Sequence, residues 1–328
     1  NWTLYLDYDS DKKVYPTLEE FTAKTKLNVK YLEDYNDNDE FYGKVQGQLK
    51  LKKDIGYDLI CPTDWMAARY IRLGYAQKLD KANIPNAKNI IPSLASVPYD
   101  TNRDYTLTWQ GIMGGFTWNK EKLPKGIHTL DELFAPANKG KIEVLTELRD
   151  TVGVIMMAQG VDITKFTADQ YYNALDFLQK KIADGFIRQV KGNDYKEDLI
   201  SGDAVACIAW SGDAFQLAAE NDGKFEFAIP ESGGTISADN FVIPSTVTAE
   251  TKPKVEKLIN YYYDPVVAAK VAAYVNYITP VQGAQAAMEK IDPTLVDNEL
   301  IFPSAKTQSK LHVFRNLTPA EETEFTDA

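Results

Sequence analysis

Short apolar runs alternate with helical patterns over the first 110 residues of the chain. Residues 2–6, 28–32 and 57–61 are apolar runs of strand length, and a segment with helical spacing of its apolar positions follows each of them. The first helix is expected to open at Thr17, because Glu20 stands three residues later, as in a capping box. This order predicts a parallel sheet covered by helices. The two further helices are expected over residues 39–48 and 65–73.

A second alternating set follows in the middle of the chain. Strands are expected around Thr117, over residues 141–145 and over residues 204–209. Thr129 and Thr167 each stand three residues before an acidic or amide side chain, which is the spacing of a capping box at a helix start. The chain therefore carries two α/β units.

Glycine- and proline-rich stretches mark the places where the chain is expected to cross between these units. They lie at residues 109–115, 230–234 and 279–283. A chain of 328 residues exceeds what one hydrophobic core usually supports, so two lobes are expected. Three crossings make both lobes discontinuous, with residues 1–110 and 237–283 in lobe 1 and residues 111–236 and 284–328 in lobe 2.

The charge balance narrows the classes of partner. The formal net charge is −11, from 36 basic and 47 acidic residues, which argues against a nucleic acid or anionic membrane surface and is compatible with a cationic ligand. No apolar run approaches the roughly 20 residues of a membrane span. The chain opens directly in a strand-like segment without a signal peptide, so we expect that a leader or tether has been removed.

Signatures of catalysis and of metal binding are scarce. Cys61 and Cys207 both sit in apolar runs, which predicts two small buried hydrophobic side chains without a bridge. His128 and His312 stand in polar contexts, where surface positions are expected and no metal or cofactor is implied. The chain has no nucleophile elbow, dinucleotide fingerprint, phosphate-binding loop or zinc-protease motif. A carboxylate-pair hydrolase stays open, because such a pair is defined by a distance in space.

Trp210 and Asp213 stand three residues apart, directly after an apolar run expected to be a buried strand. An aromatic face beside a carboxylate suits an ammonium ion that has lost its water. A core tryptophan followed by a turn and a helix N-cap is the alternative. Aromatic and polar side chains are paired again in Asn1-Trp2-Thr3-Leu4-Tyr5, in Pro62-Thr63-Asp64-Trp65 and around Asp239, so we interpret the chain as a cation-binding protein rather than an enzyme.

Two further acidic segments have both a functional and a structural interpretation. Glu147 and Asp150 follow an apolar strand, where α/β sheets usually bind ligands, but acidic residues also favour a helix N-terminus. Ser237 and Asp239 follow a glycine pair and either contribute to a site or form a turn that enters a strand. Both alternatives remain open for each pair.

Taken together, these segments resemble the bacterial spermidine/putrescine-binding proteins, the periplasmic or lipid-anchored receptors of polyamine ABC transporters. The similarity spans nearly the whole chain and is carried by the order and spacing of its motifs. It implies a type II periplasmic-binding-protein fold, in which two α/β lobes joined by a hinge close over a ligand in the cleft between them. It also implies a small cationic amine ligand, a membrane permease as partner and a monomeric state. The motifs are Asn1-Trp2-Thr3 with Tyr5, the segment 58–63, the turn 209–213, Gly233-Gly234 with Asp239, and the segment 277–280.

The resemblance also assigns roles to individual positions. Trp2 and Trp210 look like the aromatic walls around the methylene groups, and Thr63 and Trp65 fall on a hydroxyl and an aromatic position. Asp239 matches the carboxylate that fixes a terminal amine, and Asp213 matches one typical of putrescine-type receptors. The complete implied site is Trp2, Thr3, Tyr5, Thr63, Asp64, Trp65, Glu147, Asp150, Trp210, Asp213, Ser237, Asp239, Tyr277 and Phe314.

The chain departs from the family pattern at three positions. Leu4 stands where an acidic residue is usual, Ser237 where an aromatic is usual, and Phe314 where a glutamine is usual. One end of the cleft is therefore expected to be less acidic, unless Asp64 or Asp7 restores the charge. A receptor for another organic amine cation is the alternative to a polyamine receptor.

Overall fold

The structure is a computed structural model that describes residues 1–328 as two compact units. Each unit is built from two segments of the chain, so the chain passes from one unit to the other three times. Two of these passages fall inside strands β1 and β6, and the third follows Pro303. Unit 1 comprises Asn1–Gly111 and Ala238–Pro303, and unit 2 comprises Ile112–Ser237 and Ser304–Ala328.

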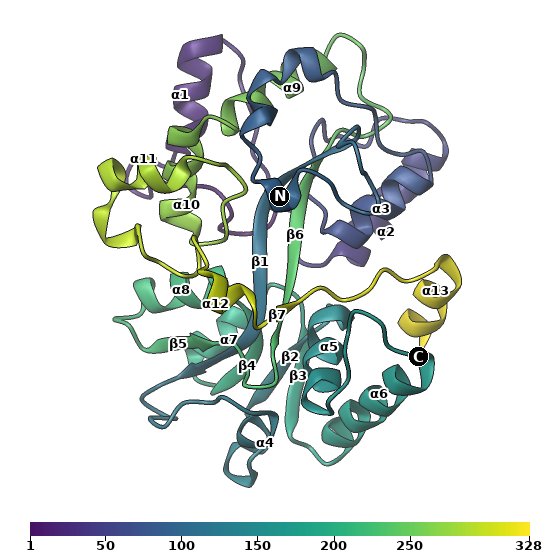
Figure 1. The fold of residues 1–328 in the computed structure, drawn as a ribbon, viewed down its shortest axis with the longest axis vertical. Helices are drawn as coiled ribbons and strands as arrows, with labels where there is room; N and C mark the ends of the chain where they lie inside the picture. The colour runs from purple at the N-terminus through teal and green to yellow at the C-terminus, as the bar shows by residue number, and fades with distance from the viewer. The chain divides into compact units, whose positions relative to one another are not determined.

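The last passage lies later in the chain than the glycine and proline pattern indicates. Residues 284–303, which that pattern assigns to lobe 2, belong to unit 1. The reason is packing: helix α11 (Ala284–Ile291) lies against helix α10 (Pro265–Val275), and its Ala284 and Met288 side chains are fully buried (Figure 1). The segment therefore completes the core of unit 1.

Helices cover much of unit 1, and the two expected over residues 39–48 and 65–73 are confirmed as α2 and α3. The expected capping box at Thr17 is wrong. Helix α1 begins at Pro16 and has no side-chain cap, whereas the carboxylate of Asp7 accepts a hydrogen bond from the backbone N–H of Thr17 at 3.0 Å. The helices of this unit outside α10 and α11 are α1 (Pro16–Thr25), α2 (Asn38–Lys50), α3 (Asp64–Arg72), α9 (Lys252–Tyr262) and the short 3₁₀ helices Lys81–Asn83, Pro85–Asn89, Pro92–Leu94 and Pro293–Leu295.

The three strands expected in the first 61 residues are wrong as regular strands, since they are reduced to isolated bridges or extended chain. Leu4 has a φ of 57°, which interrupts the extended run that contains it. Pro62 has no N–H to donate and interrupts the next ladder. Instead, Ile60 and Thr63 form antiparallel bridges with Val242 and Asp239, so Thr63 lies opposite Asp239.

A seven-stranded sheet has the order β3-β2-β4-β1-β6-β7, with β5 paired to β1. Strand β2 pairs in parallel with β3 and β4, whereas β1 pairs antiparallel with β4 and β5. The strands predicted around Thr117, over residues 141–145 and over residues 204–209 are confirmed as β1, β2 and β4. The strands are β1 (Thr106–Asn119), β2 (Ile142–Leu145), β3 (Ile187–Lys191), β4 (Ala206–Trp210), β5 (Phe225–Ala228), β6 (Gly234–Val242) and β7 (Leu311–His312).

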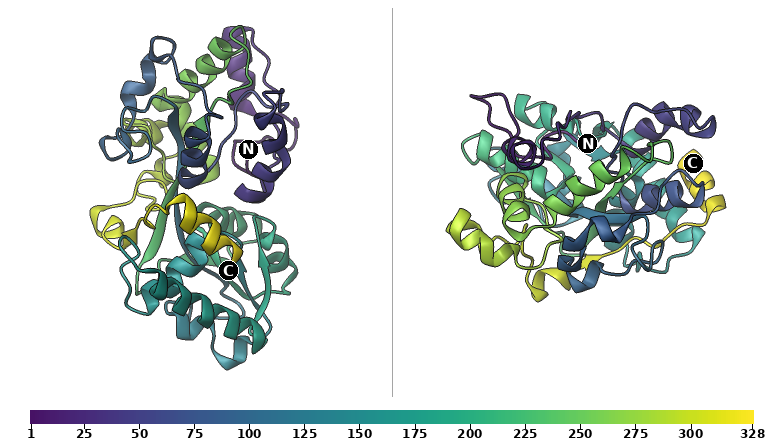
Figure 2. Two further views of the ribbon diagram at one scale, coloured as in Figure 1. Left: turned by 90° about the vertical axis from the view of Figure 1, so that its right-hand side faces the viewer. Right: turned by 90° about the horizontal axis from the view of Figure 1, so that it is seen from above.

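The helices of unit 2 pack on these strands. The capping boxes predicted at Thr129 and Thr167 are confirmed at the starts of α4 and α6. The C-terminal helix α13 lies against α6, where the Tyr171 and Phe325 rings stack with centroids 4.0 Å apart (Figures 1 and 2). The helices are α4 (Leu130–Leu133), α5 (Leu148–Ala158), α6 (Ala168–Ala183), α7 (Tyr195–Ser201), α8 (Ser211–Glu220), α12 (Ala305–Gln308), α13 (Pro319–Asp327) and the 3₁₀ helix Pro136–Asn138.

The core of unit 2 is formed by β2 and β4 together with the apolar faces of α5 and α6. Cys207 is fully buried there, Cys61 is buried in unit 1, and both are free thiols, as predicted. The mixed α/β class is also confirmed. None of the helices combines the length and the apolar character needed to cross a membrane.

Candidate functional site

In unit 1, a buried carboxylate is held by a hydroxyl group whose orientation is fixed. The Thr63 hydroxyl donates to Oδ1 of Asp239 at 2.7 Å and accepts from Nδ2 of Asn38 at 2.9 Å. The Thr63 backbone N–H also donates to Oδ1 of Asn38 at 3.2 Å. Asp239 is only 2% exposed. The bridge between residue 63 and β6 therefore positions a carboxylate that a ligand can share with Thr63.

One aromatic side chain, Tyr5, lies beside this carboxylate, and a second, Tyr277, packs on Tyr5. The rings of Tyr5 and Tyr277 meet edge to face with centroids 5.0 Å apart, and both side chains are buried. Burial, and then the charge of Asp239, raises the pKa of the Tyr5 phenol and of the Cys61 thiol. Asp239 thus acts as a negative charge within an aromatic environment, which is the environment that favours an ammonium ion.

The two tryptophans predicted for this part of the site have different surroundings. The Trp2 indole N–H donates to the Cys61 carbonyl at 2.9 Å, and the Trp2 ring lies 5.1 Å from the ring of Tyr35. The Trp65 ring already has a cation over it, because the Arg69 guanidinium lies 5.0 Å from its centroid. Trp2 therefore belongs with Cys61 beside Asp239, whereas Trp65 packs with its own helix.

Asp64 joins helix α3 to strand β6. Its carboxylate accepts hydrogen bonds from the Ala238 backbone N–H and from Nδ2 of Asn240, both at 2.9 Å, and from the Tyr99 hydroxyl. Burial raises the pKa of Asp64, and these hydrogen bonds oppose the shift. The carboxylate is therefore engaged within unit 1, as that of Asp7 is at the start of α1. Thr3 is exposed.

In unit 2, Asp150 and Trp210 meet although 60 residues separate them. The Trp210 indole N–H donates to Oδ2 of Asp150 at 2.8 Å, and the Thr235 hydroxyl donates to Oδ1. Burial raises the pKa of Asp150, and the hydrogen bonds from Thr235 and Trp210 oppose it. Gly114 permits this approach, since a Cβ there would lie 2.1 Å from the Thr235 hydroxyl oxygen. The two hydrogen-bond donors to Asp150 are uncharged, and the charge of Arg149 also lowers the pKa of Asp150.

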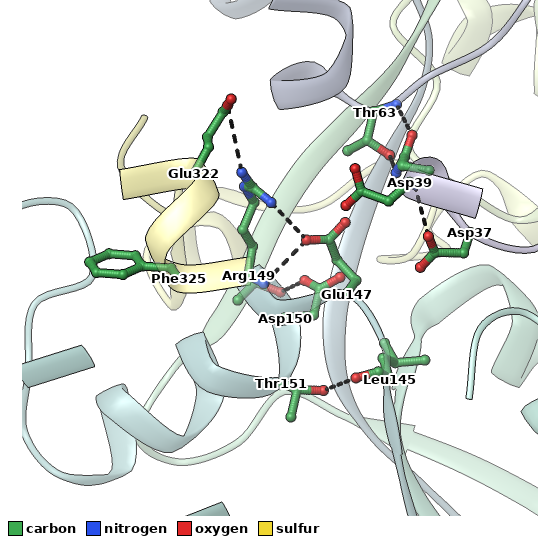
Figure 3. A network of polar contacts seen from close by, with 12 residues as sticks. Asp37, Asp39, Thr63, Leu145, Glu147, Arg149, Asp150, Thr151, Glu322 and Phe325 are labelled. Atoms are coloured by element: carbon green, nitrogen blue, oxygen red, sulfur yellow. Dashed lines mark hydrogen bonds and ion pairs between the residues drawn. The ribbon is translucent and has the colours of Figure 1, made fainter. Parts of the chain in front are cut away.

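Glu147 has the structural role that its position before a helix allows. It is the N-cap of α5, and its Oε1 accepts from the Arg149 backbone N–H at 3.2 Å. The Arg149 guanidinium also lies 3.2 Å from that oxygen and 4.0 Å from Oε1 of Glu322 (Figure 3). Glu147 therefore caps a helix and has a cationic partner.

Asp213 lies in the first turn of α8 and is 2% exposed. Nζ of Lys196 lies 3.3 Å from its Oδ1, and the Tyr195 hydroxyl donates to its Oδ2 at 3.0 Å. Nδ2 of Asn193 also donates to Oδ2, at 3.2 Å. The Tyr195 hydroxyl in turn accepts from the Trp210 backbone N–H at 3.4 Å, which connects Asp213 to the backbone of the tryptophan three residues before it.

Two further predicted positions lie in unit 2. Phe314 belongs to the hydrophobic core, where its ring centroid is 4.8 Å from that of Phe166 and its Cδ2 lies close to Gly153 of α5. Ser237 is the last residue of the long unit 2 segment and is partly buried within β6. A phenylalanine at position 314 is thus explained by core packing.

The residues that orient the acidic groups are largely missing from the sequence-based site. Thr235 holds Asp150, Asn38 orients Thr63, and residues 193–196 hold Asp213. The last segment directly follows strand β3, and the carboxyl ends of strands are where α/β sheets present ligands, so its position was an available signal. No group of three or more His, Cys, Asp or Glu side chains is arranged to hold a metal ion.

Two α/β units, each with a buried carboxylate that is positioned by a hydroxyl group beside aromatic rings, define a solute-binding protein. The chain belongs to the bacterial extracellular solute-binding protein family, whose family model matches residues 17–302. This family consists of binding proteins and not of enzymes. The hydrolase alternative is therefore set aside.

Relatives extend over almost the whole chain. The spermidine/putrescine-binding periplasmic protein of Salmonella typhimurium is 29% identical over 313 residues, which cover 94% of this chain and 84% of that protein. The putrescine-binding periplasmic protein PotF of Escherichia coli is 24% identical over 337 residues, which cover 97% and 86%.

Solved structures share the fold. The spermidine/putrescine ABC transporter substrate-binding protein PotD from Streptococcus pneumoniae superposes with a TM-score of 0.78 at 22% identity, covering 100% of this chain and 95% of that one. The protein AgtB of A. tumefacien R10, solved in complex with agropinic acid, has a TM-score of 0.74 at 17% identity, with coverage of 95% and 93%. Proteins with this fold are thus described with different ligands, so the ligand has to be inferred from side chains.

Proposed function

We propose that this protein binds an organic cation of the polyamine type and delivers it to the membrane permease of an ABC importer. The names of the relatives support a polyamine, and the family supports an extracellular binding role. The observation that carries the proposal is Asp239, a buried carboxylate oriented by Thr63, whose charge acts on Tyr5 and Cys61 and beside which Tyr277 packs on Tyr5.

Simple electrostatics explains why such a carboxylate favours an amine. An ammonium group about 4 Å from a carboxylate gains about 4 kcal/mol at an effective dielectric constant of 20, against about 1 kcal/mol in water. An aromatic ring next to the cation adds about 0.5–2 kcal/mol, and each buried methylene adds about 0.8 kcal/mol. Desolvation of the amine and ordering of the ligand offset much of this sum. Charge number and spacing are therefore expected to decide which amine binds.

The proposed contacts fall into two sets, one in each unit. Asp239, Thr63, Tyr5, Trp2 and Tyr277 form the set in unit 1. The set in unit 2 consists of Asp150 with Trp210 and Thr235. We propose that each set contacts an ammonium group of a ligand, and that the protein acts as a monomer in the periplasm or outside the cell on a lipid anchor.

A different organic amine is the second candidate, and specific contacts favour it. Asp213 is paired with Lys196, and Glu147 is paired with Arg149, so two of the predicted acidic groups already have cationic partners. Asp64 is engaged with α3 and β6. Fewer negative charges are then available to a ligand than in a site where all of these carboxylates face it.

A thermal-shift panel tests the proposal. Putrescine, spermidine, spermine, agmatine and choline are compared at equal concentrations, with 1,4-butanediol as the uncharged analogue of putrescine. A ligand present at 100 times its Kd stabilises the native state by about 2.7 kcal/mol, which raises the Tm measurably. At least one amine is expected to raise the Tm, whereas the diol is not. If the Tm with every amine equals the Tm of the ligand-free protein, the proposal of an amine ligand is refuted.

A further inference from the structure

Lys196 supplies an ammonium group inside unit 2, at a position where the resemblance implies a ligand. Its Nζ lies 3.3 Å from Oδ1 of Asp213 and 2.7 Å from Oδ1 of Asn193, and its side chain is 10% exposed. Asn193 therefore holds the ammonium with one oxygen while its Nδ2 donates to Asp213. Lys196 is fixed in place as a partner of Asp213.

The same cluster reaches the aromatic side chain of the proposed site. Tyr195 is fully buried, donates to Asp213, and has its ring 6.1 Å from that of Trp210 in an edge-to-face arrangement. The Trp210 backbone N–H donates to the Tyr195 hydroxyl. Asp213 and its partner Lys196 are therefore linked to Trp210 through Tyr195.

The second buried carboxylate beside Trp210 is held differently. Asp150 accepts its hydrogen bonds from an indole and a hydroxyl group, neither of which carries a charge. Asp213 accepts from an ammonium group as well as from uncharged donors. In unit 2, the negative charge offered to a ligand beside Trp210 is thus that of Asp150, while the charge of Asp213 is balanced from within.

We propose that Lys196 determines specificity by occupying, with its own ammonium group, the place of one ligand charge, so that the site selects a diamine over a tri- or tetra-amine. The inference rests on the proposed function and names the substrate class of that site. Asp239 and Asp150 then remain to receive ligand ammonium groups, whereas Asp213 does not. A third ammonium group would meet Lys196 instead of a free carboxylate and would be repelled.

Calorimetric titration of four proteins with putrescine and spermidine tests this inference. The proteins are the wild type, Lys196→Met, Asp213→Asn and the double variant. The wild type is expected to bind putrescine at least as tightly as spermidine. Lys196→Met removes the cation that balances Asp213. The variant is expected to change the ratio of the two Kd values at least fivefold in favour of spermidine. The double variant removes both charges and is expected to return this ratio to the wild-type value.

The ratio of two Kd values separates specificity from stability, because loss of folded protein affects both titrations equally. Asp213→Asn leaves the Lys196 charge without its carboxylate partner and is expected to weaken spermidine binding at least threefold more than putrescine binding, which keeps the inference testable if Lys196→Met fails to fold. An unchanged ratio in Lys196→Met, or spermidine binding weakened no more than putrescine binding in Asp213→Asn, would overturn it. A wild type that binds no amine would instead refute the proposed function, and the inference with it.

Discussion

Glu143 is predicted to make the stability of the protein depend on pH between about pH 6 and pH 8. It lies on β2, its side chain is fully buried, and Arg188 is 3.9 Å away. Burial, and then the hydrogen bond and charge of Asp198, raises the pKa of Glu143 from 4.5 to about 8, while Lys191 and Arg188 oppose the shift. The native state therefore keeps a proton that the unfolded chain releases.

The sign and size of the effect follow from proton linkage. Between about pH 4.5 and pH 8 the native state binds more protons than the unfolded state, so the free energy of unfolding falls as pH rises. One proton gives a slope of at most about 1.4 kcal/mol per pH unit. From pH 6 to pH 8 the loss amounts to about 2 kcal/mol. The pKa of Asp198 is lowered, by its hydrogen bond with Glu143 and then by Lys191, so its contribution is lost in acid, below this window.

Urea denaturation at pH 6, 7 and 8 of the wild type and of Glu143→Gln measures this contribution. Glutamine keeps the size of the side chain and can donate to Asp198 without titrating. The variant is expected to have a higher free energy of unfolding than the wild type at pH 8. The difference between the free energies of unfolding of the variant and the wild type should increase by about 2 kcal/mol between pH 6 and pH 8. Glu197→Gln, an exposed change on α7, is the matched control. Parallel pH profiles of the wild type and Glu143→Gln would refute the reasoning.

Two further predictions concern predicted site residues that the structure shows in structural roles. Asp64→Ala leaves the Ala238 N–H, the Asn240 amide and the Tyr99 hydroxyl without their acceptor. Urea denaturation should therefore show that the free energy of unfolding falls by about 2–4 kcal/mol. A fall of less than about 0.5 kcal/mol would contradict the role assigned to Asp64. Phe314→Ala opens a cavity beside Phe166 and should lower the free energy of unfolding by about 3–5 kcal/mol. The amine affinity measured on the folded variant should change less than threefold. A tenfold change in affinity would instead make Phe314 a ligand contact.

The hydrophobic pattern predicted the helices better than the strands of unit 1. The capping boxes at Thr129 and Thr167 predict where two helices begin, because a capping box depends only on residues that are close in the sequence. The run around Leu4 has the composition of a strand, but a positive φ and the partners available in space decide its conformation. The sequence pattern also did not predict where unit 1 ends, because α11 belongs to this unit through its packing on α10 and not through a local sequence signal.

The composition of the candidate site could be predicted only in part for the same reason. Aromatic and acidic residues close to strand-like runs predicted Trp210, Asp150 and Asp239 as site residues. The pattern gave no indication that Lys196 would partner Asp213, because these two residues lie 17 positions apart and meet through tertiary packing. Which carboxylate is balanced from within and which is offered to a ligand is a property of the folded chain.

The most direct test of the central claim is the affinity of Asp239→Asn for putrescine and spermidine, measured by isothermal titration calorimetry. The matched control is Asp297→Asn, which removes an exposed carboxylate from the same unit. Loss of the Asp239 charge is expected to weaken amine binding at least tenfold, while the control keeps the wild-type Kd within twofold. A wild-type Kd in Asp239→Asn would contradict the claim that this carboxylate receives the ligand ammonium.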